Sequence, residues 1–544
     1  MTLALRLGSL AVVAVLAACA PGSEDDADGA EQHATGSEAP KLCAAVRGNG
    51  EYVVTHFASL ARIVEHYGVI DGIAGGSSGS LSTFVYDSIR ANDAIGGDPA
   101  RVALALKSLQ GYGEALASSE EATEIGQLAG TVGRLKAELD KRGIRALIST
   151  DTARAASELK AVLSIPEVRT LVNPDAFNRL SDVTNLRYTV TEIYTSIATL
   201  GAFSVDDNRL FFRPGVLSWD GLSDLFGRVG DFYAGVNGAD TAAQSRWLDA
   251  CATTTAGRSW EDISATSCGE DFRTIVATYR AQVRAANKPS VRLAQTIGAT
   301  PRLHKLVATS VLEGAAVEAY EDADKVYRAG TVATGSIPFE PSFADVKFGY
   351  WGSAADYAAV SKASAYADDL KTTKITSLGD KTWKEILTAS PAEPGLSRFV
   401  KLPDGRYSAG GWSDLAPVLV LKRMGCDRVV YVTREGDESG FATKIAAHLG
   451  MNEGEWSSLY DLSNPKSSFT RSLDEADGVW CTNWNSFTSF QQRELAADSW
   501  QAPLETHAGW TGIAERSSYP NVTARANKPG CTPGVAGAAT YPQL

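Results

Sequence analysis

Ser77 stands in a five-residue pattern that is typical of a nucleophilic serine. The run Gly75-Gly76-Ser77-Ser78-Gly79 fits G-x-S-x-G. In enzymes that use this pattern, the glycines allow a strained turn that lifts the serine hydroxyl clear of a β-sheet. A chain with 50 glycines can meet so short a pattern by chance, so the neighbouring residues decide its meaning. The chemistry of such a serine is acyl transfer through a covalent intermediate.

The residues around Ser77 predict a strand before it and a helix after it. Residues 69–74 (VIDGIA) are typical of a short strand. The start of the following helix adds a favourable field for a developing negative charge. We therefore interpret Gly75 and Gly79 as the elbow around a nucleophile; the alternative is an ordinary glycine-rich loop. The side chains at the spacing of one helix face are Leu81, Phe84, Val85, Ser88 and Ile89.

A second glycine-rich turn precedes the elbow by one predicted helix. Residues 43–46 predict a strand that leads into Gly48-Asn49-Gly50, and a helix follows. A glycine-rich turn at a helix start offers free backbone N–H groups to an anion. In an acyl hydrolase such groups form the oxyanion hole, worth about 3 kcal/mol per donor. We predict that role for Gly48, Asn49 and Gly50. The apolar face of the helix is Phe57, Leu60, Val64 and Tyr67.

The pattern of apolar residues divides the chain into regions of different predicted secondary structure, and these regions position the two turns. Residues 42–100 alternate short apolar runs with helical patterns, and residues 331–515 return to that texture. Between them, residues 101–330 are mainly helical by pattern, and residues 516–544 form a Gly/Pro-rich tail. The sequence therefore predicts an α/β fold with a central, mostly parallel sheet that is split by a large helical insertion.

The N-terminal residues predict export. Residues 1–18 hold a short apolar run that ends in small residues just before Cys19. This arrangement resembles a bacterial lipoprotein signal; the alternative is an ordinary signal peptide. The resemblance implies that Cys19 carries lipid and holds the protein on the cell envelope, outside the cytoplasm. Residues 19–41 are acidic and rich in small residues, which favours a flexible linker.

The remaining six cysteines and the charge limit the partners and cofactors. An even number of cysteines in an exported protein favours disulfides, although buried free thiols are the alternative. Proximity in the chain favours pairing Cys251 with Cys268 and Cys481 with Cys531. No C-x-x-C or His-rich spacing indicates a metal site, and the serine chemistry requires no organic cofactor. A net charge of −13 argues against nucleic acid as a partner.

The order of strand, glycine turn, helix, strand and serine elbow resembles the patatin-like phospholipase family. Residues 333–341 (ATGSIPFEP) resemble a Ser/Pro-rich strand end of that family, and residues 410–417 (GGWSDLAP) resemble its second catalytic motif. The resemblance covers about 42–95 and 331–435. It implies a three-layer patatin-like sandwich and hydrolysis of acyl lipids or phospholipids by Ser77.

One residue of the family pattern is missing. Patatin-like enzymes pair the serine with an aspartate and use no histidine, and counting back from Pro417 places that aspartate at Ala409. Asp414, in the same loop, is our candidate for the base; its alternative role is to cap the helix that begins near Pro417. Asp404 is weaker, because Pro403-Asp404-Gly405 has the chemistry of a hairpin turn.

Two further interpretations remain open. His448 or His507 would suit a Ser-acid-His triad, although each is more readily a helix or surface residue. The chain could also be a catalytically inactive scaffold that serves as a surface-displayed binding protein, because Ala409 replaces the family aspartate. If the chain is an enzyme, its substrate is an acyl lipid, a small ester or a peptidoglycan-linked acyl group.

Overall fold

The structure is a computed structural model that describes residues 41–48, 54–117, 131, 134–172, 186, 190, 229–235, 241–285, 304–314, 317–318, 321, 345–354, 375–379, 383–390, 400–411, 414, 416–434, 451–459, 461, 463–482 and 518–520. Several sequence predictions lie outside these residues. They concern the signal peptide and Cys19, the linker up to residue 40, Asn49, Gly50, the segment 333–341, His448, His507 and Cys531. No helix within the described ranges is long and apolar enough to cross a membrane.

A mostly parallel central sheet organises the molecule, as the sequence predicts. Among the described residues its order is β10-β9-β8-β1-β2-β3-β4-β5, and β9, β8, β1, β2 and β3 run parallel to one another. The strands are β1 (Leu42–Val46), β2 (Gly72–Gly76), β3 (His304–Leu312), β4 (Val346–Trp351), β5 (Ile375–Gly379), β6 (Val400–Lys401), β7 (Tyr407–Ser408), β8 (Arg428–Arg434), β9 (Gly478–Thr482) and β10 (Ser518–Pro520).

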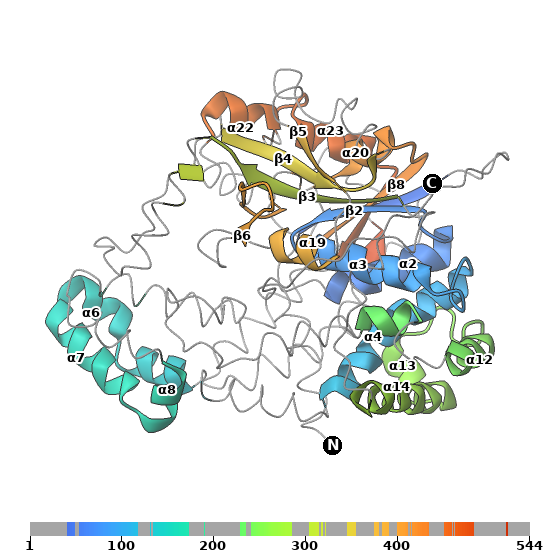
Figure 1. Cartoon of the computed structure of the whole chain (residues 1–544), viewed down its shortest axis with the longest axis horizontal. Coiled ribbons are helices and arrows are strands. Elements are labelled where there is room, and N and C mark those ends of the chain that lie inside the picture. Colours follow the sequence, from blue (N-terminus) through green and yellow to red (C-terminus); the bar gives the residue numbers. More distant parts are fainter. Residues whose placement is uncertain are drawn as a thin grey trace.

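Helices cover both faces of this sheet (Figure 1). On one face lie α2 (Val54–Tyr67), α3 (Ser78–Ala91) and α19 (Trp383–Ala389), and on the other lie α20 (Val418–Arg423), α22 (Glu453–Leu459) and α23 (Ser468–Glu475). The remaining described helices are α4 (Pro99–Ala117), α6 (Ile144–Thr150), α7 (Thr152–Leu163), α8 (Pro166–Leu171), α12 (Thr241–Cys251), α13 (Trp260–Ser264) and α14 (Ser267–Ala285).

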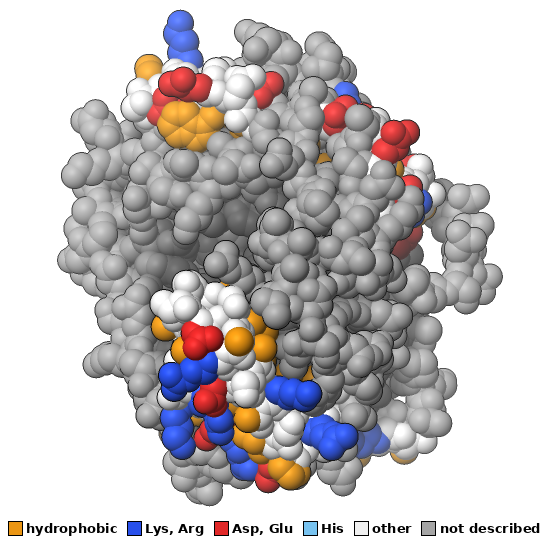
Figure 2. Space-filling view, turned by 90° about the vertical axis from the view of Figure 1, so that its left-hand side faces the viewer, with side chains coloured by type: hydrophobic (Ala, Val, Ile, Leu, Met, Phe, Trp, Pro, Cys, Tyr) orange, Lys and Arg blue, Asp and Glu red, His pale blue; other side chains and the backbone are white. Residues whose placement is uncertain are grey.

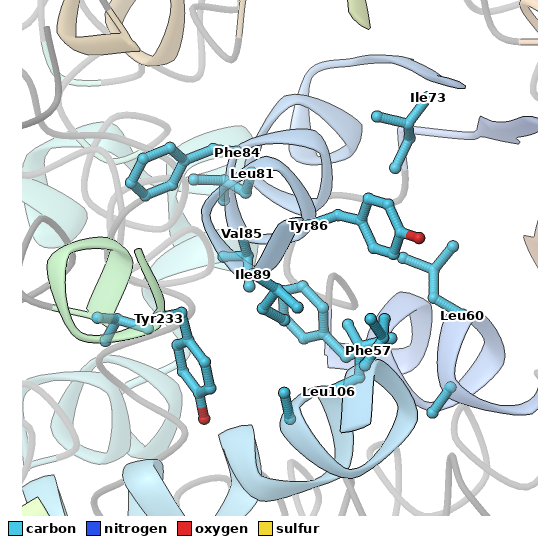
Figure 3. Close-up of a cluster of buried hydrophobic side chains, with 14 of the residues drawn as sticks. Phe57, Leu60, Ile73, Leu81, Phe84, Val85, Tyr86, Ile89, Leu106 and Tyr233 are labelled. Atoms are coloured by element: carbon cyan, nitrogen blue, oxygen red, sulfur yellow. The ribbon is translucent and has the colours of Figure 1, made fainter. Parts of the chain in front are cut away.

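Strands β1 and β2 carry no charged side chain, as expected for strands whose two faces are both buried. In β1, Leu42, Ala44 and Val46 belong to the core that faces α2 and α3, whereas Cys43 and Ala45 belong to the core that faces α20. The first of these cores is the larger, and side chains of α2, α3 and α4 meet in it (Figure 3). Both turns that carry the predicted chemistry follow such buried strands.

The helical insertion is shorter than the sequence predicts. Strand β3 lies within the range 101–330, yet it pairs in parallel with β2 from Gly72↔His304 to Gly76↔Ala308. The sheet therefore resumes at His304 rather than at 331. The mixed apolar and polar residues of this segment give no clear strand period, so the pairing with β2 decides its structure. Residues 518–520, assigned to the tail, form edge strand β10, which pairs antiparallel with β9.

The helices of the insertion are amphipathic. The aromatic side chains of α14 pack inward, with Phe272 and Tyr279 each in contact with Phe232. Charged side chains of both signs gather on the face of the molecule that α6, α7 and α8 present (Figure 2). Arg142, just before α6, forms ion pairs with Glu138 and Glu158.

Within the described residues, two disulfides join distant or neighbouring segments of the fold. The Cys251–Cys268 pair confirms the prediction from proximity. The other bond joins Cys43 of β1 to Cys426, just before β8, across 383 positions of sequence, and the sequence did not predict it. Parallel pairing of β1 with β8 brings these cysteines together. Cys481 lies on β9, and its predicted partner Cys531 is outside the described residues.

Candidate active site

Ser77 occupies a strained turn between β2 and α3. Its backbone angles are φ 52° and ψ −125°, and it is the only residue other than glycine with a positive φ in the described part of the chain. Such a conformation costs about 1–3 kcal/mol and persists only where surrounding contacts enforce it. The residue is 8% exposed. This is the backbone geometry that a nucleophile elbow requires.

The two flanking glycines of the pattern are required by close backbone contacts. A Cβ atom on Gly75 would lie 2.7 Å from the carbonyl oxygen of Gly79, and one on Gly79 would lie 2.7 Å from the carbonyl oxygen of Val46. Real Cβ atoms do not come so close to a backbone oxygen, so larger residues would open the turn. The start of α3 therefore packs directly on the ends of β1 and β2.

The glycine turn after β1 lies beside the elbow. Strands β1 and β2 pair in parallel up to Val46↔Gly75, so their carboxyl ends meet at one edge of the sheet. A Cβ atom on Gly48 would lie 3.1 Å from the Cβ atom of Ser77. Asn49 and Gly50, the two remaining predicted oxyanion donors, are outside the described residues. Gly48 therefore packs directly against Ser77.

A third segment, the loop that follows β7, closes on the elbow from another direction. A Cβ atom on Gly411 would lie 2.2 Å from the backbone nitrogen of Ser77. Strand β7 pairs antiparallel with the end of β3 at Val311↔Ser408, beyond the point where β2 stops. The Thr309 hydroxyl donates to the carbonyl oxygen of Gly410 at 3.2 Å, which fixes the loop.

Ser390, just after α19, is bonded directly to the elbow. The backbone N–H of Ser77 donates to Ser390 Oγ at 2.9 Å, and Ser390 Oγ donates to the carbonyl oxygen of Ala308 at 2.9 Å. Ser390 is completely buried. Sequence analysis did not single it out, because a serine after an apolar helical run has no local signal that points to Ser77.

Asp414 lies three residues beyond Gly411 and is half-buried. Its carboxylate accepts a hydrogen bond of 2.7 Å from the Tyr350 hydroxyl of β4. Burial raises the pKa of Asp414 to about 7, although hydrogen bonds from Tyr350 and the backbone of Ala416 act in the opposite direction. Asp414 is not the N-cap residue of α20, which is Pro417, but its carboxylate accepts a hydrogen bond from the backbone of Ala416, just before that helix. Tyr350 was not predicted from the sequence.

Ala409 and Asp404 do not supply the base. Ala409 is 2% exposed and packs in the core that faces α20, so the position where the resemblance would place an aspartate carries no polar side chain. Asp404 lies in the β6–β7 turn, where it is bonded to Arg406, as its hairpin-turn chemistry predicts. His448 and His507, the two histidine candidates, lie outside the described residues.

His56 of α2 is a structural residue. It is completely buried, and its Nδ1 shares a hydrogen bond of 2.7 Å with Ser82 Oγ of α3. Burial, and next the positive charge of Arg47, lower the pKa of His56 to about 3. The ring is therefore neutral at pH 7 and ties α2 to α3.

Comparison of the chain with protein-family models, with curated proteins and with solved structures finds no match. Within the described residues, no group of three or more His, Cys, Asp or Glu side chains gathers in a way that could hold a metal ion.

Proposed function

We propose that the protein is a serine acyl-ester hydrolase in which Ser77 is the nucleophile. The observation that carries this proposal is the positive φ of Ser77 in a turn against which Gly48 and Gly411 both pack. A fold does not need to strain an ordinary serine in this way, and such strain concentrates at functional sites. The carboxyl ends of parallel strands are also where α/β proteins place their ligands.

The proposed reaction has two stages. Ser77 Oγ attacks the ester carbonyl while its proton passes to a carboxylate, and the oxyanion is held by backbone N–H groups of the Gly48 turn and the start of α3. The alcohol then leaves with a proton from the acid formed in the first stage. Water, deprotonated by the same carboxylate, attacks the acyl enzyme, and the acyl–oxygen bond to Ser77 breaks as Ser77 Oγ takes that proton back, which releases the fatty acid.

Asp414 is the proposed base. It lies three residues beyond Gly411, which packs against the Ser77 backbone. A general base works best when its pKa lies near the operating pH, and the raised pKa of Asp414, about 7, meets that condition. Ala409 cannot supply a proton acceptor.

The fold family, the substrate and the location in the proposal rest on the resemblance to patatin-like phospholipases and to lipoprotein signals. The fold is a three-layer patatin-like sandwich, and the substrate is an acyl lipid or phospholipid. The protein is exported and held on the bacterial cell envelope through lipid on Cys19, which would bring the site to its substrate. Neither a cofactor nor a nucleic acid takes part.

A fluorophosphonate probe tests the proposal directly, since it labels only an activated serine. We expect labelling of the purified wild-type ectodomain and loss of that labelling in Ser77→Ala. Ser88→Ala, which removes a buried hydroxyl of α3 that is bonded to Phe84, serves as the matched control and should label normally. Equal labelling of Ser77→Ala and the wild type would refute the assignment.

A second candidate function is favoured by Ala409. A buried alanine at the position of the family aspartate is what a scaffold would show if it had lost catalysis and retained only ligand binding. In that case a well-folded wild-type sample would not label at any serine. Binding of intact phospholipid vesicles without release of fatty acid would support this second function.

A further inference from the structure

The hydroxyl of Ser390 stands between the elbow and the sheet. Ala308, whose carbonyl accepts from Ser390 Oγ, is the residue of β3 that pairs with Gly76, the last residue of β2. Ser77, whose N–H donates to the same oxygen, is the first residue beyond β2. The Ser390 hydroxyl therefore bridges the N–H of Ser77 and the carbonyl of Ala308, just beyond the last residue pair of β2 and β3.

We infer that Ser390 is a positioning residue that holds the Ser77 backbone in its strained conformation; the inference rests on the proposed role of Ser77 as nucleophile. A serine hydroxyl has one proton and two lone pairs. Because that proton is given to Ala308, a lone pair of Ser390 Oγ is directed to the amide of Ser77. The acceptor is therefore oriented before any substrate binds.

Helix α19 fixes Ser390 because it is attached to α3 at its other end as well. The indole N–H of Trp383, the first residue of α19, donates to Asp87 at 3.1 Å. The Trp383 ring also packs edge-on against Phe84, with 5.4 Å between ring centroids. Asp87 lies late in α3 whereas Ser77 precedes it, so α19 runs antiparallel to α3 and braces the elbow helix at both ends.

The bond to Ser390 has a chemical consequence for the site. The N–H of Ser77 is committed to Ser390 and does not contribute to the oxyanion hole, so that role falls to the Gly48 turn and to the start of α3. Without Ser390 the buried amide of Ser77 and the carbonyl of Ala308 would both lose a partner. Such a loss favours relaxation of the turn, and a displacement of about 1 Å can lower a catalytic rate about 100-fold.

The test compares Ser390→Ala with Ser88→Ala and the wild type, using hydrolysis of a soluble p-nitrophenyl ester. We expect Ser390→Ala to lower kcat about 10- to 100-fold with KM nearly unchanged, since the residue does not touch the substrate. Ser88→Ala also removes one buried hydroxyl but has no bond to the elbow, so its kcat should match the wild type. Wild-type kcat in a folded Ser390→Ala protein would overturn the inference.

Hydrogen exchange of the segment 72–80 gives a readout that does not depend on activity. Ser390→Ala should accelerate exchange of the Ser77 amide, whereas Ser88→Ala should not; equal protection in both variants would also overturn the inference. Should Ser390→Ala fail to fold, Ser390→Cys replaces it, because the thiol fills the site but is a weak hydrogen-bond partner. It should change kcat and exchange in the same direction, and wild-type values for both would refute the role.

Failure of the proposed function gives a different result. If the wild-type protein neither hydrolyses esters nor labels with fluorophosphonate, Ser77 is not a nucleophile, whatever the exchange data show. If the wild type is active and the Ser390 variants match it in kcat and in exchange of the Ser77 amide, the positioning role alone is wrong.

Discussion

Gly411 lies so close to Ser77 that a Cβ atom on the glycine would come within 2.2 Å of the Ser77 backbone nitrogen. This contact joins two segments that are far apart in the sequence. It arises because β7 pairs with β3 beyond the end of β2, which places the loop after β7 directly over the serine turn. Asp414 lies three residues further along the chain, where it accepts a hydrogen bond from Tyr350.

Gly411→Ala should therefore damage both the site and the fold. The added methyl group would overlap the backbone of Ser77, so the loop and the elbow must separate. We expect a loss of about 1–3 kcal/mol in the free energy of unfolding, typical of overpacking, and at least a 100-fold loss of kcat. Chemical denaturation and ester hydrolysis measure the two effects.

Gly97→Ala is the matched control for this prediction, because no heavy atom lies within 4 Å of a Cβ atom built at Gly97. It should leave stability and turnover unchanged. A Gly411→Ala protein as stable and as active as Gly97→Ala would contradict the contact.

Two substitutions at Ser77 should separate the effect of losing the nucleophile from the effect of the strained backbone conformation. Both Ser77→Ala and Ser77→Gly remove the nucleophile and should abolish turnover. Alanine keeps the strain of the positive φ, whereas glycine adopts that conformation readily, so Ser77→Gly should be more stable than Ser77→Ala by about 1 kcal/mol. Thermal denaturation measures the difference, and a less stable glycine variant would argue against a strained turn.

Asp414→Asn should lower kcat about 100-fold or more at pH 8, as expected for loss of a general base. Because the pKa of Asp414 is raised to about 7, the wild-type rate should increase with pH through about 7 as the carboxylate forms. Turnover measured from pH 5 to 9 tests both statements. Near-normal turnover of the variant would remove Asp414 from the mechanism.

Asp414 should also make stability depend on pH in a defined direction. Between its ordinary pKa of 3.8 and the raised value of about 7, the folded state keeps a proton that the unfolded chain releases. The contribution of Asp414 to the free energy of unfolding therefore falls as pH rises through this window. Asp414→Asn lacks that fall, so denaturation midpoints of wild type and variant, measured at pH 4.5 and 7.5, should differ in their pH dependence.

His56 should have the opposite effect on stability. Its pKa is lowered from 6.5 to about 3 by burial and by Arg47, so the folded state keeps the ring neutral while the unfolded chain binds a proton below pH 6.5. The stability contributed by the neutral ring is present above pH 6.5 and is lost progressively as pH falls towards 3. Between pH 7.5 and 5, the wild type should lose more stability than His56→Gln. Equal losses in urea denaturation would indicate that the ring is not buried.

Local features of the sequence determined the two turns and their flanking elements. Strand β1, helix α2 and helix α3 each follow from the spacing of apolar residues within a few positions, and the glycines around Ser77 permit a turn that other residues resist. The α/β class with a mostly parallel sheet follows from the same patterns. These predictions succeed because strand and helix periods depend on neighbours along the chain.

The tertiary structure alone decided which distant residues meet at Ser77. Nothing in the local pattern identifies β3 at His304, the partner of Cys43, the hydroxyl of Ser390 or the contact with Gly411. Each depends on the order of strands in the sheet, which sets what lies beside the carboxyl end of β2. The spacing of apolar residues determines whether a segment is a helix or a strand and which of its faces is buried. Which other elements pack against that face depends on how all the elements are arranged.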